Sequence, residues 1–295
     1  MQCKSGREAP FPLQVPGMLV LADNNPVRHI RRPYVNWALI AACVVIFFLD
    51  PSYRDFGFTP ASLHPVAKPL APQPGWDLVM LQSVSYIFLH GDLMHLAGNM
   101  LALWVFGNNV EDSMGHRRYP LFFLICGMAG AFAEGLFSPT PQVPVIGASG
   151  AVAGVMGAYL LLHPRARVLV LVAFRIPLLV PASAFVGLSI ALDVLSALFP
   201  DPDAEMLIAW WAHIGGFAAG ALLILVMRHR DVALFQPAAI YPENGFGRFR
   251  WLMINLAPRP GSETQQASRW RQVFFGLKTL TFFLIIVVII ETIFA

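Results

Sequence analysis

The sequence predicts an all-α protein that crosses a membrane several times, and three observations lead to this fold class. The chain has 295 residues, of which 57% are hydrophobic and only 13% are charged. Soluble domains carry about 25% charged residues, so this chain has too few charges to cover a soluble surface. Apolar runs recur along the chain, and basic residues gather in alternate connections between them. The composition therefore excludes a disordered chain and a basic nucleic-acid-binding module, and no nucleic-acid partner is expected.

Seven apolar runs are predicted to form transmembrane helices, because a hydrocarbon core needs about 20 residues of helix. They cover residues 35–49, 93–109, 119–137, 148–163, 177–199, 208–227 and 272–294. The first run is short and ends abruptly at Asp50-Pro51. The stretch from Trp76 to His90 is too apolar for a solvated loop and too short to span. We expect it to lie along the membrane surface.

The basic residues predict the orientation. Most of the 20 lie in the N-terminal tail, in the second-to-third and fourth-to-fifth connections, and after the sixth run. The positive-inside rule then places the N-terminus in the cytoplasm. We expect a cytoplasmic tail (1–32), a six-helix core (33–228), a cytoplasmic linker (229–271) and an additional C-terminal transmembrane helix (272–295). We expect a multi-pass protein of a prokaryotic plasma membrane.

Four polar side chains inside the apolar runs share one depth. His95 and Asn99 begin the second run, Ser149 begins the fourth and His213 lies about a turn inside the sixth. At 1.5 Å per residue, all four fall within roughly 10 Å of the outer edge of the hydrocarbon core. Polar groups in a bilayer cost free energy unless they have a partner or a function. A water-accessible cavity open to the outer side would account for their common depth.

The residue types point to nucleophilic catalysis. Ser149 lies in Gly147-Ala148-Ser149-Gly150, where a loop enters a helix and backbone N–H groups are unpaired. Small residues follow Ser149, and others, including Gly216, surround His213, so the two helices could approach closely. A neutral imidazole would then activate the hydroxyl.

Donors for a developing oxyanion are also available near this serine. His95 and Asn99 are four residues apart and so share one helix face. Together with the backbone N–H of Ser149, they are candidate oxyanion-stabilising groups.

Other interpretations apply to each residue taken singly. The small residues could serve packing alone, and His213 or Asn99 could simply join helices. Glu134 and Asp193 are predicted to be structural rather than catalytic. His90, Asp92 and His95 could suggest a metal site, but their spacing does not match the paired histidines of a zinc-protease helix, and no metal or cofactor is expected. A transporter is a weaker alternative, because its polar groups would lie at the midplane.

The chain resembles the rhomboid intramembrane serine proteases. The resemblance rests on His90-Gly91-Asp92-Leu93-Met94-His95-Leu96-Ala97-Gly98-Asn99, on Gly147-Ala148-Ser149-Gly150, and on Ala212-His213-Ile214-Gly215-Gly216 with Gly220. The three motifs occur in the family's order within about residues 33–228.

The resemblance implies a rhomboid-like six-helix core plus a seventh helix. It also implies a Ser149–His213 dyad without a third acidic member, oxyanion binding by His95 and Asn99, and support of the site by His90, Gly147, Gly150 and Gly216. Substrates would be single-span or otherwise membrane-anchored proteins cut in or near their transmembrane segment. The oligomeric state is not implied. A catalytically inactive relative that binds transmembrane clients is the alternative.

The chain departs from the family pattern at two places. Ala153 stands where well-studied bacterial relatives have an aromatic residue that stacks on the histidine. Leu81-Gln82 stands where they have a Trp-Arg pair in the first loop. Phe217, Trp210 or Trp211 would have to orient His213 in place of the missing aromatic.

Overall fold

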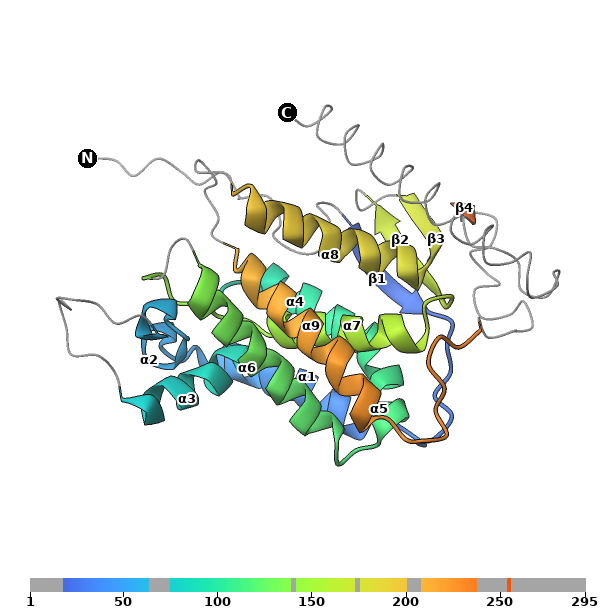
Figure 1. The fold of residues 1–295 in the computed structure, drawn as a ribbon, viewed down its shortest axis with the longest axis horizontal. Coiled ribbons are helices and arrows are strands. Elements are labelled where there is room, and N and C mark those ends of the chain that lie inside the picture. The colour runs from blue at the N-terminus through green and yellow to red at the C-terminus, as the bar shows by residue number, and fades with distance from the viewer. Residues whose placement is uncertain are drawn as a thin grey trace.

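The computed structural model describes residues 18–63, 75–138, 142–172, 176–200, 208–237 and 254–255. The expected seventh helix (272–294) and most of the expected linker (229–271) lie outside these residues. Within the described part of the chain, the helices form an elongated bundle with a small β-sheet along one side (Figure 1).

The main helical elements follow the predicted apolar runs. The first is α1 (Tyr34–Leu49). The second apolar run is one continuous helical stretch made of α4 (Leu93–Ala102), the π-helix η3 (Leu103–Gly107) and α5 (Asn108–Met114). The remaining four are α6 (Tyr119–Phe137), α7 (Ser149–Leu162), α8 (Ala182–Leu198) and α9 (Trp210–Met227). Among the described residues, α6 and α9 are long and apolar enough to cross a membrane, while α1, α7 and α8 are shorter apolar helices.

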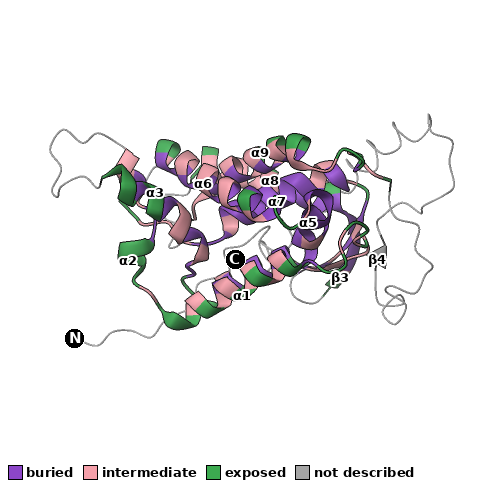
Figure 2. Ribbon diagram, turned by 90° about the horizontal axis from the view of Figure 1, so that it is seen from below, coloured by how far each residue is buried: buried purple, intermediate pink, exposed green. Residues whose placement is uncertain are grey.

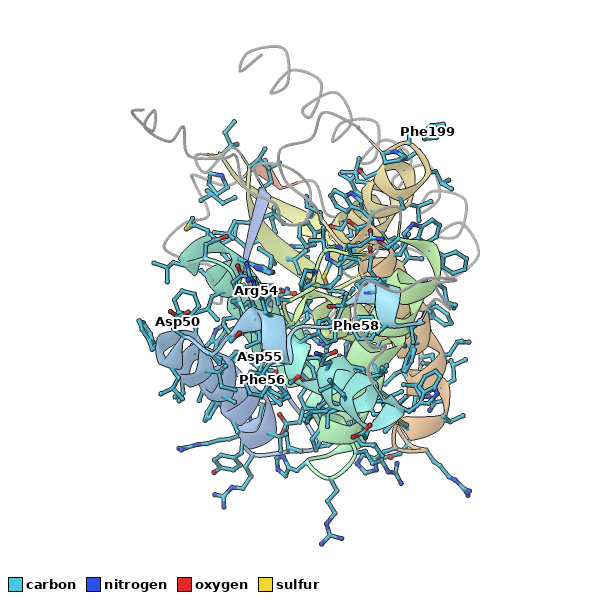
Figure 3. All side chains as sticks on the ribbon, turned by 90° about the vertical axis from the view of Figure 1, so that its left-hand side faces the viewer. Asp50, Arg54, Asp55, Phe56, Phe58 and Phe199 are labelled. Carbon is cyan, nitrogen blue, oxygen red and sulfur yellow. The ribbon has the colours of Figure 1, made fainter. Side chains whose placement is uncertain are left out.

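The connection between α1 and α4 is itself folded. It contains α2 (Tyr53–Phe56), η1 (Pro60–Leu63), α3 (Trp76–Ser85) and η2 (Tyr86–Phe88). The predicted interfacial stretch thus forms a short helix that contacts α6. Figure 3 looks onto this end of the bundle, where Asp50, Arg54, Asp55, Phe56 and Phe58 lie, with Phe199 projecting from the end of α8.

Helix α7 is the centre of the bundle and is buried along almost its whole length (Figure 2). It packs against α6 and α9 through backbone rather than through large side chains. A Cβ atom on Gly216 would overlap the carbonyl of Gly150, and one on Gly220 would overlap the carbonyl of Gly154. The close approach predicted for the helices that carry Ser149 and His213 is therefore confirmed.

The π-helix η3 has an identifiable cause. Asn36 of α1 is fully buried and donates from Nδ2 to the Leu103 carbonyl (2.8 Å) and to Asn108 Oδ1 (2.9 Å). Its Oδ1 accepts from the Tyr119 hydroxyl at 2.8 Å. A side chain inserted in this way into the hydrogen-bond ladder locally widens a helix. Gly107 allows the approach, because a Cβ there would collide with Asn36.

A β-sheet is the main feature that the all-α expectation did not include. The strands β1 (Met18–Asp23), β2 (Arg167–Val172), β3 (Ile176–Pro181) and β4 (Ile254–Asn255) pair in that order. The β1–β2 and β2–β3 pairs are antiparallel, and Val170 is the register partner of both Val20 and Leu178. The predicted fifth span (177–199) is corrected accordingly, because its first residues are in β3 and the helix begins at Ala182.

Alternation explains why β2 is a strand. Its even-numbered residues are buried and its odd-numbered ones are half-buried, which is the period of two that a strand requires. Valine dominates the buried positions, and β-branched residues favour strands. The sheet packs against α8, η3 and α4.

The last residue of β1, Asp23, anchors the strand to the helices. Its Oδ2 accepts from the Tyr159 hydroxyl of α7 (2.6 Å) and from Nδ2 of Asn109 in α5 (2.9 Å). Burial among these helix ends raises the pKa of the Asp23 carboxyl to about 7, although the hydrogen bond from Tyr159 favours the charged form.

We predict that alanine at Gly220 destabilises the fold. An added methyl group would push α9 away from the Gly154 carbonyl, and overpacking of this kind costs about 1–3 kcal/mol. Thermal unfolding in detergent measures the effect. Gly187→Ala in α8 is the matched control, because a Cβ there meets nothing within 4 Å. Its helix propensity should leave the melting temperature equal or higher. Equal melting temperatures for wild type and Gly220→Ala would contradict the close contact.

We predict that Asp23 makes stability fall as the pH rises. Its pKa is higher in the folded chain than in the unfolded one, so the folded state binds the extra proton. This contribution is complete below about pH 4 and is lost as the pH rises to and through 7. Asp23→Asn cannot titrate, so its unfolding free energy, compared with that of wild type between pH 4 and 8, should show a smaller decline. Parallel curves would contradict the prediction.

Candidate active site

Ser149 is the first residue of α7 and is half-buried. The loop before it turns at Gly147, whose φ of +122° is a conformation that favours glycine. The Gly147 N–H donates to the Tyr86 carbonyl at 2.9 Å, and Val145 pairs with Phe58 through two backbone hydrogen bonds. Two segments of the α1–α4 connection therefore fix the loop that presents the serine.

Gly147 also brings His95 to the serine. A Cβ on Gly147 would lie 2.6 Å from His95 Nε2 and 3.8 Å from Ser149 Oγ, so both polar atoms border the same point. Asp92 stabilises the first turn of α4, which carries His95. Its Oδ1 accepts from the N–H groups of Met94 and His95, both at 2.8 Å. This is an N-cap, which satisfies the unpaired donors of the first turn.

The N-cap bears on the alternative metal site. His90 and His95 lie close together, with ring centroids 5.1 Å apart, and His90 Nδ1 contacts the Phe88 carbonyl at 3.3 Å. Asp92, the third candidate metal ligand, instead accepts hydrogen bonds from the backbone of α4. Over the described ranges, no group of three histidine, cysteine or acidic side chains could hold a metal ion.

Asn99 lies one turn below His95 and is fully buried. Its Nδ2 donates to the His95 carbonyl at 3.1 Å, within the same helix. Its Oδ1 has no hydrogen-bond partner among the described residues. The structure therefore places Asn99 on the predicted face, with one of its two amide N–H groups engaged.

His213 lies in the first turn of α9 and is 7% exposed. The start of this helix is held by Glu134 of α6, whose Oε2 accepts from the Ala212 N–H at 3.0 Å. Glu134 is thus a cap supplied by a neighbouring helix, which agrees with the structural role predicted for it. The Trp210 ring meets the His213 ring edge to face, with centroids 5.9 Å apart. Trp210 is therefore the aromatic residue that contacts this histidine.

Ser149 and His213 line one cavity. Its wall also contains Ala153, Met156, Val186, Ser189, Ile190, Asp193 and Phe217. The space open to the centre of a water-sized sphere is about 20 Å³, enough for about one water molecule. Within the described part of the chain, Ser149 Oγ makes no hydrogen bond to His213. Such bonds are often long before substrate binds and shorten in the complex.

Asp193 of α8 completes the wall of this cavity. Its Oδ1 lies 3.3 Å from His213 Nδ1, and the two side chains are 13% and 9% exposed. The sequence predicted a structural role for Asp193 but could not show that it would face His213, because that depends on the rotation of α8 against α9.

The remaining residues pack as supports. A Cβ on Gly150 would contact the Tyr86 hydroxyl (3.1 Å) and the Ala212 carbonyl (3.2 Å), so this glycine keeps α7 close to α9. Tyr86, which sequence reasoning missed, is 1% exposed and donates its hydroxyl to the Gly127 carbonyl at 2.6 Å. The only signal for it was an aromatic residue in an interfacial stretch.

The first-loop departure also has a structural consequence. Gln82 is buried, and its Nε2 donates to the Asp55 carbonyl at 3.1 Å, joining α3 to α2. Leu81 beside it is 55% exposed. The glutamine thus holds the loop together where the family pattern has a charged residue.

We predict that Glu134→Ala destabilises the chain by about 1–3 kcal/mol, because the start of α9 would lose a hydrogen bond to a carboxylate. The Ala212 N–H would keep only the Ala209 carbonyl, 3.1 Å away. Glu134→Gln is the matched control, since its side-chain oxygen can still accept this bond. Unfolding by denaturant should order the three proteins as wild type, Gln variant and Ala variant. An Ala variant as stable as wild type would refute the capping role.

Comparisons with known proteins agree with this architecture. The family model of the Rhomboid domain matches residues 78–230. The chain is 36% identical over 138 residues to "Rhomboid protease GluP" of Bacillus subtilis (44% of this chain, 24% of the relative). It is 32% identical over 165 residues to "RHOMBOID-like protein 4" of Arabidopsis thaliana (55% and 36%) and 30% identical over 141 residues to the mitochondrial "Rhomboid protein 1" of Saccharomyces cerevisiae (46% and 38%).

The matches thus span less than two fifths of the length of these relatives. The family match covers more than half of the chain, and the protein belongs to the rhomboid family of integral membrane proteins.

Proposed function

We propose that the chain is an intramembrane serine endopeptidase that cleaves membrane-anchored proteins in or near their transmembrane segment. The observation that carries this proposal is the single cavity shared by Ser149 and His213, with room for a water molecule. The family membership supports it, since one of the relatives is named a rhomboid protease.

The proposed reaction is acyl transfer in two steps. Ser149 Oγ attacks the scissile carbonyl carbon while His213 takes the hydroxyl proton, and the carbonyl oxygen becomes an oxyanion. His213 then gives that proton to the leaving amine as the C–N bond breaks. A water molecule, deprotonated by His213, then attacks the acyl carbon. His213 returns this proton to Ser149 Oγ as the ester C–O bond breaks, which releases the carboxylic acid and restores Ser149. No metal or cofactor takes part.

The oxyanion would form beside Gly147, where the His95 imidazole borders the serine. A donor already aimed at this point stabilises the transition state more than the substrate, and losing such a donor costs about 10²–10³ in rate. The Ser149 backbone N–H, at the unpaired start of α7, is a second donor. The second amide N–H of Asn99, which the bond to the His95 carbonyl does not use, would be a third donor.

We propose the topology from the charge distribution. The tail 1–32 and the linker 229–271 would be cytoplasmic, the core 33–228 would form the protease, and 272–295 would add one helix. The site would then open toward the outer side of a prokaryotic plasma membrane, so water would reach it without crossing the bilayer.

We predict that Ser149→Ala abolishes cleavage of a single-span substrate in liposomes, lowering the rate by at least about a thousandfold. Ser196→Ala in α8 is the control, since Ser196 is a serine of an apolar helix outside the cavity. It should cleave like wild type. Equal cleavage by Ser149→Ala and wild type would contradict the proposal. A wild type that folds and binds the substrate without cleaving it would favour the inactive, client-binding alternative.

A further inference from the structure

We propose that Asp193 is a positioning residue for His213, so that this chain uses a Ser149–His213–Asp193 triad rather than a dyad. The inference rests on the proposed function. The carboxylate comes from a third helix, α8, and lies 3.3 Å from the histidine Nδ1. Among the described residues, it is the one acidic side chain within ion-pair distance of His213.

Placing the Asp193 carboxylate in an apolar helix costs desolvation free energy, which a partner must compensate. It lies in the apolar stretch Ile190-Ala191-Leu192-Asp193-Val194-Leu195 of α8, and its side chain is 13% exposed. A carboxylate there loses most of its hydration, which costs free energy unless a partner compensates. Within the described chain the partner is His213, on the facing helix α9.

Glu134, the other acidic residue of this region, is already engaged. Its Oε2 accepts from the Ala212 N–H, which holds the backbone of α9 rather than the imidazole ring. His95 borders the serine at Gly147, where a Cβ would lie 2.6 Å from its Nε2. The three acidic and imidazole groups around the site therefore make separate contacts, and Asp193 is the one within ion-pair distance of the His213 ring.

The bond fixes which nitrogen of the ring does chemistry. When Nδ1–H is donated to Asp193, the lone pair of the neutral imidazole is on Nε2, and Nε2 is the nitrogen left to face the Ser149 hydroxyl. A carboxylate on Nδ1 plays this part in serine proteases of other folds, where it holds the tautomer and the ring orientation without taking the proton. The same geometry stabilises the imidazolium that forms when Ser149 attacks.

The neighbourhood of the ring explains why this chain needs the carboxylate. Ala153, one turn after the serine, is too small to stack on the histidine. Trp210 contacts the ring edge to face rather than stacking on it. The Asp193 carboxylate of α8, 3.3 Å from the histidine Nδ1, supplies the missing constraint.

The test compares Asp193→Asn and Asp193→Ala with wild type and with Ser196→Ala, a control on the same helix. Cleavage of a single-span substrate in liposomes gives kcat and KM, and thermal unfolding shows that each variant is folded. We expect both Asp193 variants to lose at least about tenfold in kcat, with KM within about twofold, and Ser196→Ala to match wild type. A kcat within twofold of wild type in both Asp193 variants would overturn the inference.

A second readout does not depend on activity. Nitrogen NMR of ¹⁵N-histidine-labelled protein at pH 9, with His213 assigned from a His213→Asn sample, reports which ring nitrogen carries the proton. We expect the Nδ1–H tautomer in wild type and a shift toward Nε2–H in Asp193→Ala. The same tautomer in both would overturn the inference, even if kcat falls. Failure of the proposed function would appear instead as a folded wild type that does not cleave, and the NMR result would still decide whether Asp193 holds His213.

Discussion

The contact of the α7 backbone with the α9 backbone is the constraint on which the rest of the site depends. Gly150 and Gly154 meet Gly216 and Gly220 so closely that no side chain fits between them. In a bilayer, apolar side chains gain little by leaving lipid for protein, so helices associate through close packing and polar contacts. This approach places the first turns of the two helices side by side, and Ser149 and His213 both lie there.

The segments outside α7 and α9 mainly stabilise the first turns of these two helices and the loop before α7. Glu134 satisfies the start of α9, and the loop before α7 is fixed by the Tyr86 carbonyl and by Phe58. Asp92 orders the start of α4, which carries His95 to the same point. Polar groups at helix ends would otherwise be unpaired in an apolar surrounding, so each of these bonds both stabilises the fold and fixes a reacting group.

Much of the bundle could be predicted from the sequence, because apolar runs report helices directly. The shared depth of Ser149, His213, His95 and Asn99 predicted one site, and the structure brings Ser149 to His213 and to His95. The sheet was missed, since a strand buried on one side and a membrane helix are both apolar, and the strand Ile176–Pro181 merged with the helix that follows it. The contact of Asp193 with His213 could not be predicted, because it depends on how α8 turns against α9. Pairing of β1 with β2 joins residues far apart in the chain, which no local pattern reports.

We propose that the α7–α9 contact makes Ser149 a nucleophile activated by His213. Reaction with a fluorophosphonate, followed by peptide mass spectrometry, tests it most directly because the adduct marks the activated oxygen. We expect one adduct, on the peptide that contains Ser149, and none in folded His213→Ala protein. An adduct on another residue, or equal labelling of Ser149 in His213→Ala, would contradict the claim.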